Sequence, residues 1–149
     1  MNQYLLSLLA LIGGAFLALQ GSLNAQLGLL LKNPLLASLI AFCSSTCFAF
    51  CLVLLTTKHY PNAIIIREVP IYLWFAGGLF SLIGISLYYY TIPKLGLSTM
   101  ISFGLCGQLV FAVIAGHFGW FGLPTEPMSL QRLGGLVAMI VGILLINLK

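Results

Sequence analysis

Five long apolar runs are the feature that most limits the fold of this 149-residue chain. A helix needs about 20 consecutive apolar residues to cross the hydrocarbon core of a bilayer, and each run meets or approaches that length. We expect spans at residues 4–31, 35–57, 70–92, 95–116 and 129–148. The first run is long enough to require tilting, bending or protrusion. The sequence therefore predicts an all-α integral membrane protein with five transmembrane helices, in a single membrane domain covering residues 1–149.

The composition agrees with this prediction and excludes other classes. The chain is 61% hydrophobic and only 5% charged, whereas soluble domains carry roughly 25% charged residues. Its net charge of +4 comes from scattered bases beside the apolar runs. Such bases are typical of membrane anchors, so we expect the lipid bilayer as a partner and no nucleic acid. No basic segment precedes the first run, and we expect that run to remain as a membrane helix rather than a cleaved signal.

The basic residues are divided equally between the two sides of the membrane. One side carries Lys58, Arg67 and Arg132, and the other carries Lys32, Lys94 and Lys149. The side that is richer in Lys and Arg normally stays in the cytoplasm, and an equal division removes that preference. Chance alone often produces such a tie. With the odd number of spans, the balance nevertheless predicts dual topology, in which two oppositely oriented copies pair.

Small residues recur at three- and four-residue steps along three of the spans. The first span carries Ser7, Ala10, Gly14, Ala18, Gly21, Ala25 and Gly28, the third carries Gly77, Ser81 and Gly84, and the fifth carries Gly134, Ala138 and Gly142 beside Gly135. Small side chains allow helix backbones to approach closely in lipid. For the first and third spans we favour packing within the bundle.

The fifth span resembles the last helix of small multidrug resistance transporters. The run from Gly135 to Ile143 is similar to their glycine-spaced dimerisation pattern, although Ala138 and Met139 stand where that pattern prefers larger or branched aliphatic residues. The resemblance implies a dimer contact at Gly134, Gly135, Ala138 and Gly142.

Across nearly the full chain, the sequence resembles the YdcZ-type family of inner-membrane exporters in the drug/metabolite transporter superfamily. The similar segments are 13–27, 77–84, 95–109, 117–122 and 132–148. The resemblance implies half of a ten-helix inverted-repeat bundle, rebuilt as an antiparallel homodimer in the bacterial cytoplasmic (inner) membrane. It also implies a small-molecule site at the midplane and access by rocking.

Polar residues within the spans are the candidates for that site, because polar side chains in hydrocarbon usually face a bundle interior or cavity. Gln20 and Asn24 lie four residues apart on one face of the first span, and Gln108 lies deep in the fourth. Their amides suit a neutral or zwitterionic solute. Hydrogen bonding between helices is the alternative role.

Aromatic residues and cysteines offer weaker candidates. Trp74 and Tyr88, Tyr89 and Tyr90 lie near the ends of the third span, where they could line a cavity or anchor the helix in an aromatic belt. One tyrosine of the three should face inward, since successive helical residues point 100° apart. Cys43, Cys47 and Cys51 form one stripe, which we interpret as small-residue packing rather than a soft-metal site.

Acidic residues are nearly absent. The chain has no aspartate, and its two glutamates, Glu68 and Glu126, lie between spans. A simple proton/cation exchange scheme, which uses a carboxylate in the membrane, is therefore disfavoured. His117 could carry a proton near a span end, although capping of the fourth helix is the favoured role.

The leading hypothesis is a transporter of a small organic solute that works by alternating access. The alternatives are a narrow dual-topology channel and a non-transporting subunit or assembly factor. We expect no enzyme activity, no cofactor and no metal, because no nucleophile-base pair or ligand set is apparent.

Overall fold

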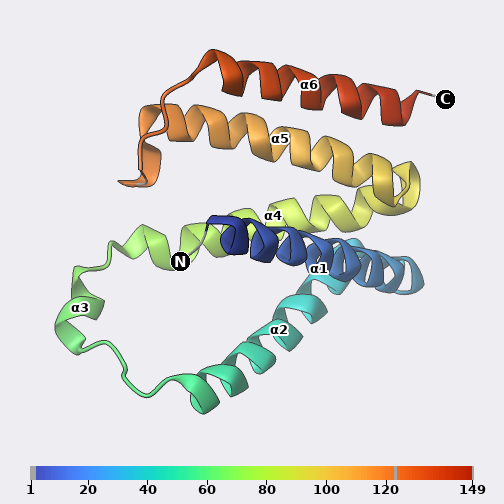
Figure 1. Cartoon of the computed structure of the whole chain (residues 1–149). Coiled ribbons are helices and arrows are strands. Elements are labelled where there is room, and N and C mark those ends of the chain that lie inside the picture. The colour runs from blue at the N-terminus through green and yellow to red at the C-terminus, as the bar shows by residue number, and fades with distance from the viewer. Residues whose placement is uncertain (1–2, 123, 149) are drawn as a thin grey trace. The chain divides into compact units, whose positions relative to one another are not determined.

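The computed structural model describes residues 3–122 and 124–148, and these form helices and connections without a strand. In chain order the elements are α1 (Gln3–Leu30), α2 (Pro34–Thr56), α3 (Ala63–Glu68), α4 (Ile71–Leu95), α5 (Leu97–Phe118), the 3₁₀ turn η1 (Trp120–Gly122) and α6 (Leu130–Asn147) (Figure 1). Among the described residues, α1, α2, α4, α5 and α6 are long and apolar enough to cross a membrane. The all-α, five-span fold is confirmed, and the inverted-repeat relationship stays a prediction. Lys149, counted in the charge balance, lies outside the described residues.

Two helical features differ from the predicted spans. The third span does not stop at Pro93, because α4 includes this proline and continues to Leu95. Proline lacks an N–H but can occupy the last turn, where one lost hydrogen bond affects little of the helix. Gly96 then adopts φ 85° and separates α4 from α5. The polar connection after α2 also contains the short helix α3, capped by the Asn62 side chain, which accepts from the Ile65 N–H at 3.0 Å.

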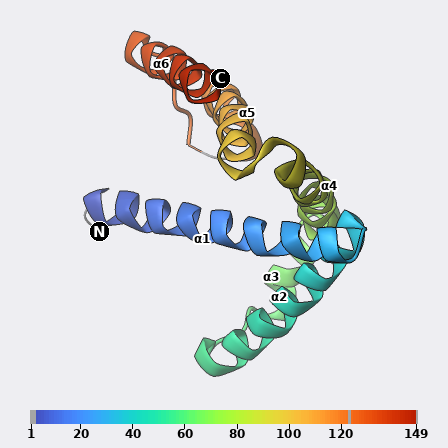
Figure 2. The same ribbon diagram turned by 90° about the vertical axis from the view of Figure 1, so that its right-hand side faces the viewer.

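Residues 1–94 form one compact unit. Its helices α1 and α2 meet at their connection and diverge from it (Figure 2). Asn33 fixes this turn, since its side-chain oxygen accepts from the N–H groups of Leu35 at 2.9 Å and Leu36 at 3.3 Å. Pro34 occupies the first turn of α2, where its missing N–H costs no hydrogen bond.

The core of this unit lies close to the α1–α2 connection. Tyr89 of α4 is only 2% exposed and packs with Ala37 and Ala41 of α2. On α1, the buried residues Gly21, Ala25 and Gly28 repeat at four- and three-residue steps. The predicted packing of the first-span seam is thus confirmed for its C-terminal half. A methyl group on Gly13 or Gly14 would meet no described atom within 4 Å, and the same holds for Gly77, Gly78 and Gly84 of the third-span seam.

Residues 95–149 form the second unit, in which α5 and α6 run side by side in opposite directions (Figure 1). Gly119 ends α5 in the left-handed conformation, with φ 62°, and its N–H bonds to the carbonyls of Ala115 and Gly116. The connection then folds back, because the Glu126 N–H donates to the Gly116 carbonyl at 2.8 Å. Ser129 caps α6 by accepting from the Arg132 N–H at 3.2 Å.

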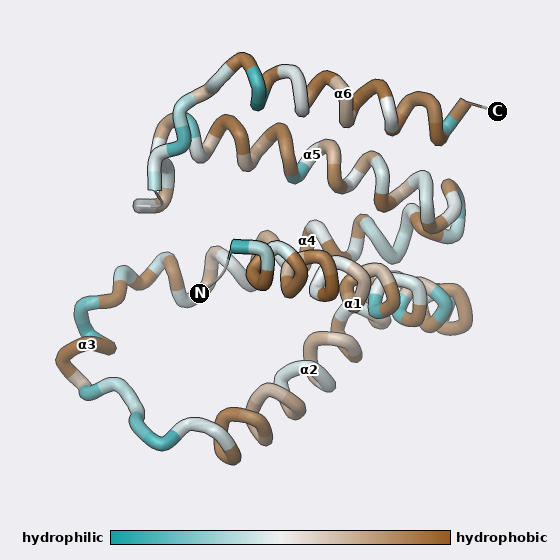
Figure 3. Tube along the Cα trace, in the orientation of Figure 1, coloured by the Kyte–Doolittle hydropathy of each residue, from teal (hydrophilic) through white to brown (hydrophobic). Residues whose placement is uncertain are grey.

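The surface of the helices is strongly apolar. Large side chains such as Leu11, Phe16 and Phe75 are 66–71% exposed, and the hydrophilic residues gather mainly in the connections between helices (Figure 3). A soluble protein would not expose this much contiguous apolar surface. In a bilayer the same side chains contact lipid, while the helices satisfy their own backbone hydrogen bonds.

Gly28 makes the close approach of α1 and α2 testable. A methyl group there would lie 3.4 Å from the Pro34 Cα and 3.5 Å from the Ala37 Cβ. Gly28→Leu should therefore force the helices apart and destabilise the protein by about 1–3 kcal/mol, the usual cost of overpacking. The control is Gly14→Leu, which adds the same side chain to the same helix where no described atom lies within 4 Å. Thermal unfolding in detergent should separate the two variants, and equal stabilities would contradict the close approach.

Candidate functional site

A polar cluster joins α1 to α4 within the first unit. The Gln20 Nε2 donates to the Tyr89 hydroxyl at 3.3 Å, a contact between residues 69 positions apart. The Asn24 side chain also lies within reach of the same hydroxyl. The structure therefore brings together three of the predicted site residues. Both amides are half-buried, and Tyr89 is the buried member of its tyrosine triplet.

Small residues make this approach possible. Gly21 and Ala25 lie on α1 between and beside the two amide residues, and both are buried. A methyl group on Gly21 would stand 3.6 Å from the Ile92 Cδ1 of α4, which is ordinary van der Waals contact. The side of α1 that packs therefore adjoins the side that carries the amides. This arrangement places polar groups at the edge of a helix contact.

A second pair of polar side chains, Ser38 and Ser86, joins α2 to α4. The Ser38 Oγ lies 2.9 Å from the Ser86 Oγ, and it also donates to the Pro34 carbonyl at 3.0 Å. Because one hydroxyl has one hydrogen, Ser86 is then the donor to Ser38. Ser38 is fully buried, and Ser86 precedes Tyr89 by three residues on the same helix. Neither serine was among the candidates from the sequence, because serine is common in membrane helices and usually bonds to its own backbone.

The chemistry available at Gln20, Asn24, Tyr89 and the serine pair is neutral. Amides and hydroxyls both donate and accept hydrogen bonds, and none of them carries a charge near neutral pH. Such groups can exchange their mutual hydrogen bonds for bonds to a polar solute. A permanently charged ion would find no opposite charge among these side chains.

A family comparison decides which class of membrane protein carries this arrangement. The model of the family described as "Putative inner membrane exporter, YdcZ" matches residues 5–145. The chain belongs to the YdcZ family. No curated protein and no solved structure matches the chain. Family membership and five membrane-capable helices together make it a multi-pass inner-membrane protein of an exporter family, a class of transporter rather than enzyme.

Trp74 and Tyr90 of this YdcZ-family chain are exposed, in contrast to the buried Tyr89. Trp74 is 57% exposed near the start of α4. Tyr88 packs against the core, whereas Tyr90 is exposed and its ring lies 3.5 Å from the Lys94 Nζ. The inward orientation predicted for one tyrosine of the triplet is confirmed in Tyr89. Belt anchoring suits the other exposed rings.

Gln108 lies on α5 in the second unit and is exposed within it. That it shares a site with Gln20 and Asn24 stays a prediction. Cys43, Cys47 and Cys51 are exposed free thiols, so the packing expected for this stripe is not seen within their unit.

His117 has a specific structural contact. Its Nδ1 accepts a hydrogen bond from the Met128 N–H at 3.1 Å, across eleven residues of the α5–α6 connection. His117 lies in the last turn of α5, whose end is closed by the Gly119 N–H, and its side chain also holds the connection. Its capping role stays a prediction. A proton-linked role for this residue stays a prediction.

Three of the predicted dimer residues, Gly134, Ala138 and Gly142, are not among the residues that line the space between α5 and α6, whereas Gly135 is. Gly134, Gly135 and Ala138 are exposed and Gly142 is half-buried. A methyl group on any of these three glycines would meet no described atom within 4 Å. The helix contacts α5 through another side, on which Ile143 is buried. Gly134, Ala138 and Gly142 thus leave a small-residue side of α6 available for a second chain, and Gly135 lies at its border with the α5 contact. The dimer role of these residues stays a prediction.

Proposed function

We propose that the protein transports a small, neutral or zwitterionic organic solute across the inner membrane by alternating access, as an antiparallel dual-topology homodimer. Exporter-family membership supports transport. The hydrogen-bonded cluster of Gln20, Asn24 and Tyr89 is the observation that carries the substrate class. Its amides and hydroxyl provide donors and acceptors without net charge.

Each chain would supply one copy of the cluster, and Gln108 and Trp74 are further candidates for the solute pathway. In inverted-repeat transporters the substrate lies near the midplane, between the two repeats. Two oppositely oriented five-span chains would reproduce that relationship. The equal division of the six basic residues and the open small-residue side of α6 support such a pair.

Reconstituted proteoliposomes test the proposal. Mixtures of radiolabelled amino acids and polyols, which are zwitterionic and neutral, should show time-dependent uptake, and unlabelled solute inside should accelerate it. Such counterflow requires a carrier that reorients, so a channel would give faster flux without it. Matching solutes should also raise the unfolding temperature of the purified protein. Absence of both flux and thermal stabilisation for all solutes would favour a non-transporting subunit.

A further inference from the structure

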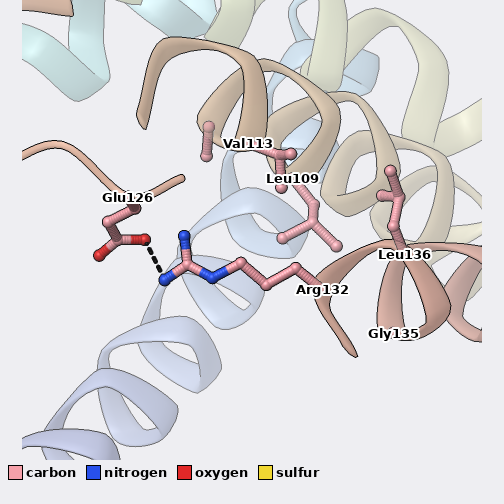
Figure 4. A pocket seen from close by; sticks show the side chains of 7 residues that line it. Leu109, Val113, Glu126, Arg132, Gly135 and Leu136 are labelled. Atoms are coloured by element: carbon pink, nitrogen blue, oxygen red, sulfur yellow. Dashed lines mark ion pairs between the residues drawn. The ribbon is translucent and has the colours of Figure 1, made fainter. Parts of the chain in front are cut away.

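An amphipathic cleft lies within the second unit, between α5 and α6. It has a volume of about 340 Å³, near the lower end of the range for ligand sites. Figure 4 shows its two kinds of lining. Leu109, Ala112, Val113 and Leu136 form an aliphatic wall with Gly135, and Glu126 and Arg132 stand at one end.

The charged end is an ion pair that remains open to the surroundings. The Arg132 Nη2 lies 2.8 Å from the Glu126 Oε2, and the two side chains are 43% and 60% exposed. An exposed pair of this kind stabilises a fold very little. The guanidinium and the carboxylate can therefore separate and bind an incoming ligand with little loss of folding stability.

The lining of the cleft begins near the polar end of α5 and α6 and continues along their apolar length. Arg132 lies in the first turn of α6, beside the polar connection that also carries the clustered rings of Phe118, Trp120 and Phe121. Aromatic rings of this kind are typical of the headgroup level. At 1.5 Å per residue, Leu109 is about 14 Å from the end of α5 at Phe118. This distance is close to half of the roughly 30 Å hydrocarbon core.

We propose that this cleft binds a zwitterionic phospholipid with a primary amine in its headgroup. The phosphate would pair with the Arg132 guanidinium, the ammonium would donate to the Glu126 carboxylate, and one acyl chain would fill the aliphatic wall. The pair has no net charge, so it complements a zwitterion. A phosphate on Arg132 lies near the Glu126 carboxylate in either case, and an anionic headgroup has no ammonium to pair with that carboxylate and offset the repulsion.

The amine distinguishes this ligand from a phosphatidylcholine of equal charge. A primary ammonium donates charge-assisted hydrogen bonds to a carboxylate, whereas a quaternary ammonium has no hydrogen to donate. One such bond corresponds to an about tenfold difference in affinity. The proposal concerns lipid binding and stands independently of solute transport.

Native mass spectrometry of the detergent-purified protein tests this site. Dioleoyl phosphatidylethanolamine should bind about tenfold more tightly than dioleoyl phosphatidylcholine. Glu126→Gln should abolish the preference, and Arg132→Gln should weaken both lipids. The matched control is the double variant Arg67→Gln and Glu68→Gln, which removes the chain's other arginine and glutamate from the connection outside the cleft. This control should keep the full preference.

Filling the cleft gives a second measurement that leaves the charges in place. Ala112→Phe should reduce the binding of both lipids by occupying the aliphatic wall. Glycerophosphoethanolamine, which has the same headgroup without acyl chains, should not displace bound lipid. The proposal is overturned by equal binding of the two lipids, by a preference that survives Glu126→Gln, or by lipid binding unaffected by Ala112→Phe.

Discussion

Replacing Gln20 and Asn24 together by leucine is expected to leave insertion intact and to reduce solute transport by about 8- to 300-fold. The range follows from two lost hydrogen bonds to the solute, each worth about 0.6–1.7 kcal/mol in a membrane protein. Both amides are half-buried beside Tyr89, so a solute that displaces their bonds to its hydroxyl would contact them directly. Initial uptake rates in proteoliposomes at equal protein content provide the measurement.

A matched variant distinguishes a specific effect of Gln20 and Asn24 from a general effect of removing an amide from α1. Gln26→Leu makes the same kind of change on the same helix, at an exposed position that is not among the Tyr89 partners. Its transport should stay near the wild-type rate. Equal losses in Gln26→Leu and in the double variant would remove Gln20 and Asn24 from the solute pathway.

The double variant could also lose activity through instability, because it removes both side-chain partners of a buried tyrosine hydroxyl. Adding Tyr89→Phe resolves this ambiguity. The combined change removes the stranded hydroxyl, and replacing all partners by apolar groups is often nearly neutral for stability. The unfolding temperature of this triple variant should recover, while its transport should stay low. Recovery of transport together with stability would assign the cluster a purely structural role.

Much of the fold could be predicted from the sequence, because run length and hydropathy alone determine which segments can cross a bilayer. The ends of the spans depend on local chemistry that hydropathy does not describe. The third span was predicted to end at residue 92, yet α4 continues through Pro93 to Leu95. The helix α3 forms in a polar connection because the Asn62 side chain supplies a cap that a hydropathy pattern ignores.

The candidate site was only partly predictable. The amides of Gln20 and Asn24 were conspicuous, since polar side chains are rare in hydrocarbon. Serine hydroxyls are not conspicuous, because they usually bond to their own helix, as Ser22 does with the Ala18 carbonyl at 2.8 Å. The Ser38–Ser86 pair joins residues 48 positions apart, and a single sequence gives no signal for that contact.

The ion pair between Glu126 and Arg132 could not be predicted from the sequence for a related reason. Glu126 follows two glycines and a proline in the α5–α6 connection, so its sequence context predicts only an exposed loop. Tertiary hydrogen bonds return this loop to the end of α5, through the Gly116 carbonyl and the His117 ring. These bonds bring the carboxylate to Arg132. The spacing of residues along the chain does not indicate that the connection folds back onto the end of α5.

Membrane orientation should respond strongly to small changes in the charge balance. With reporters fused after Lys149, the wild type should give signals from a reporter active only inside the cell and from one active only outside. Changing Lys58 and Arg67 to glutamine leaves one basic residue on their side and three on the other. The side with three should then stay in the cytoplasm, so the C-terminus should be found inside.

The opposite pair of changes is the matched control. Changing Lys32 and Lys94 to glutamine removes the same charge from the other side and should place the C-terminus outside. A wild-type signal on one side only would contradict dual topology.

The same two variants test whether the working unit contains both orientations. Each variant alone supplies chains of one orientation, so an antiparallel pair cannot form and transport should be lost. Expressing the two variants together restores both orientations, and transport should return without any change at Gln20, Asn24 or Tyr89. Full transport by one single-orientation variant would contradict the antiparallel dimer while leaving the polar cluster as the solute site. Loss of transport in each variant and its rescue on co-expression would therefore test the antiparallel dimer independently of the solute-binding role of the polar cluster.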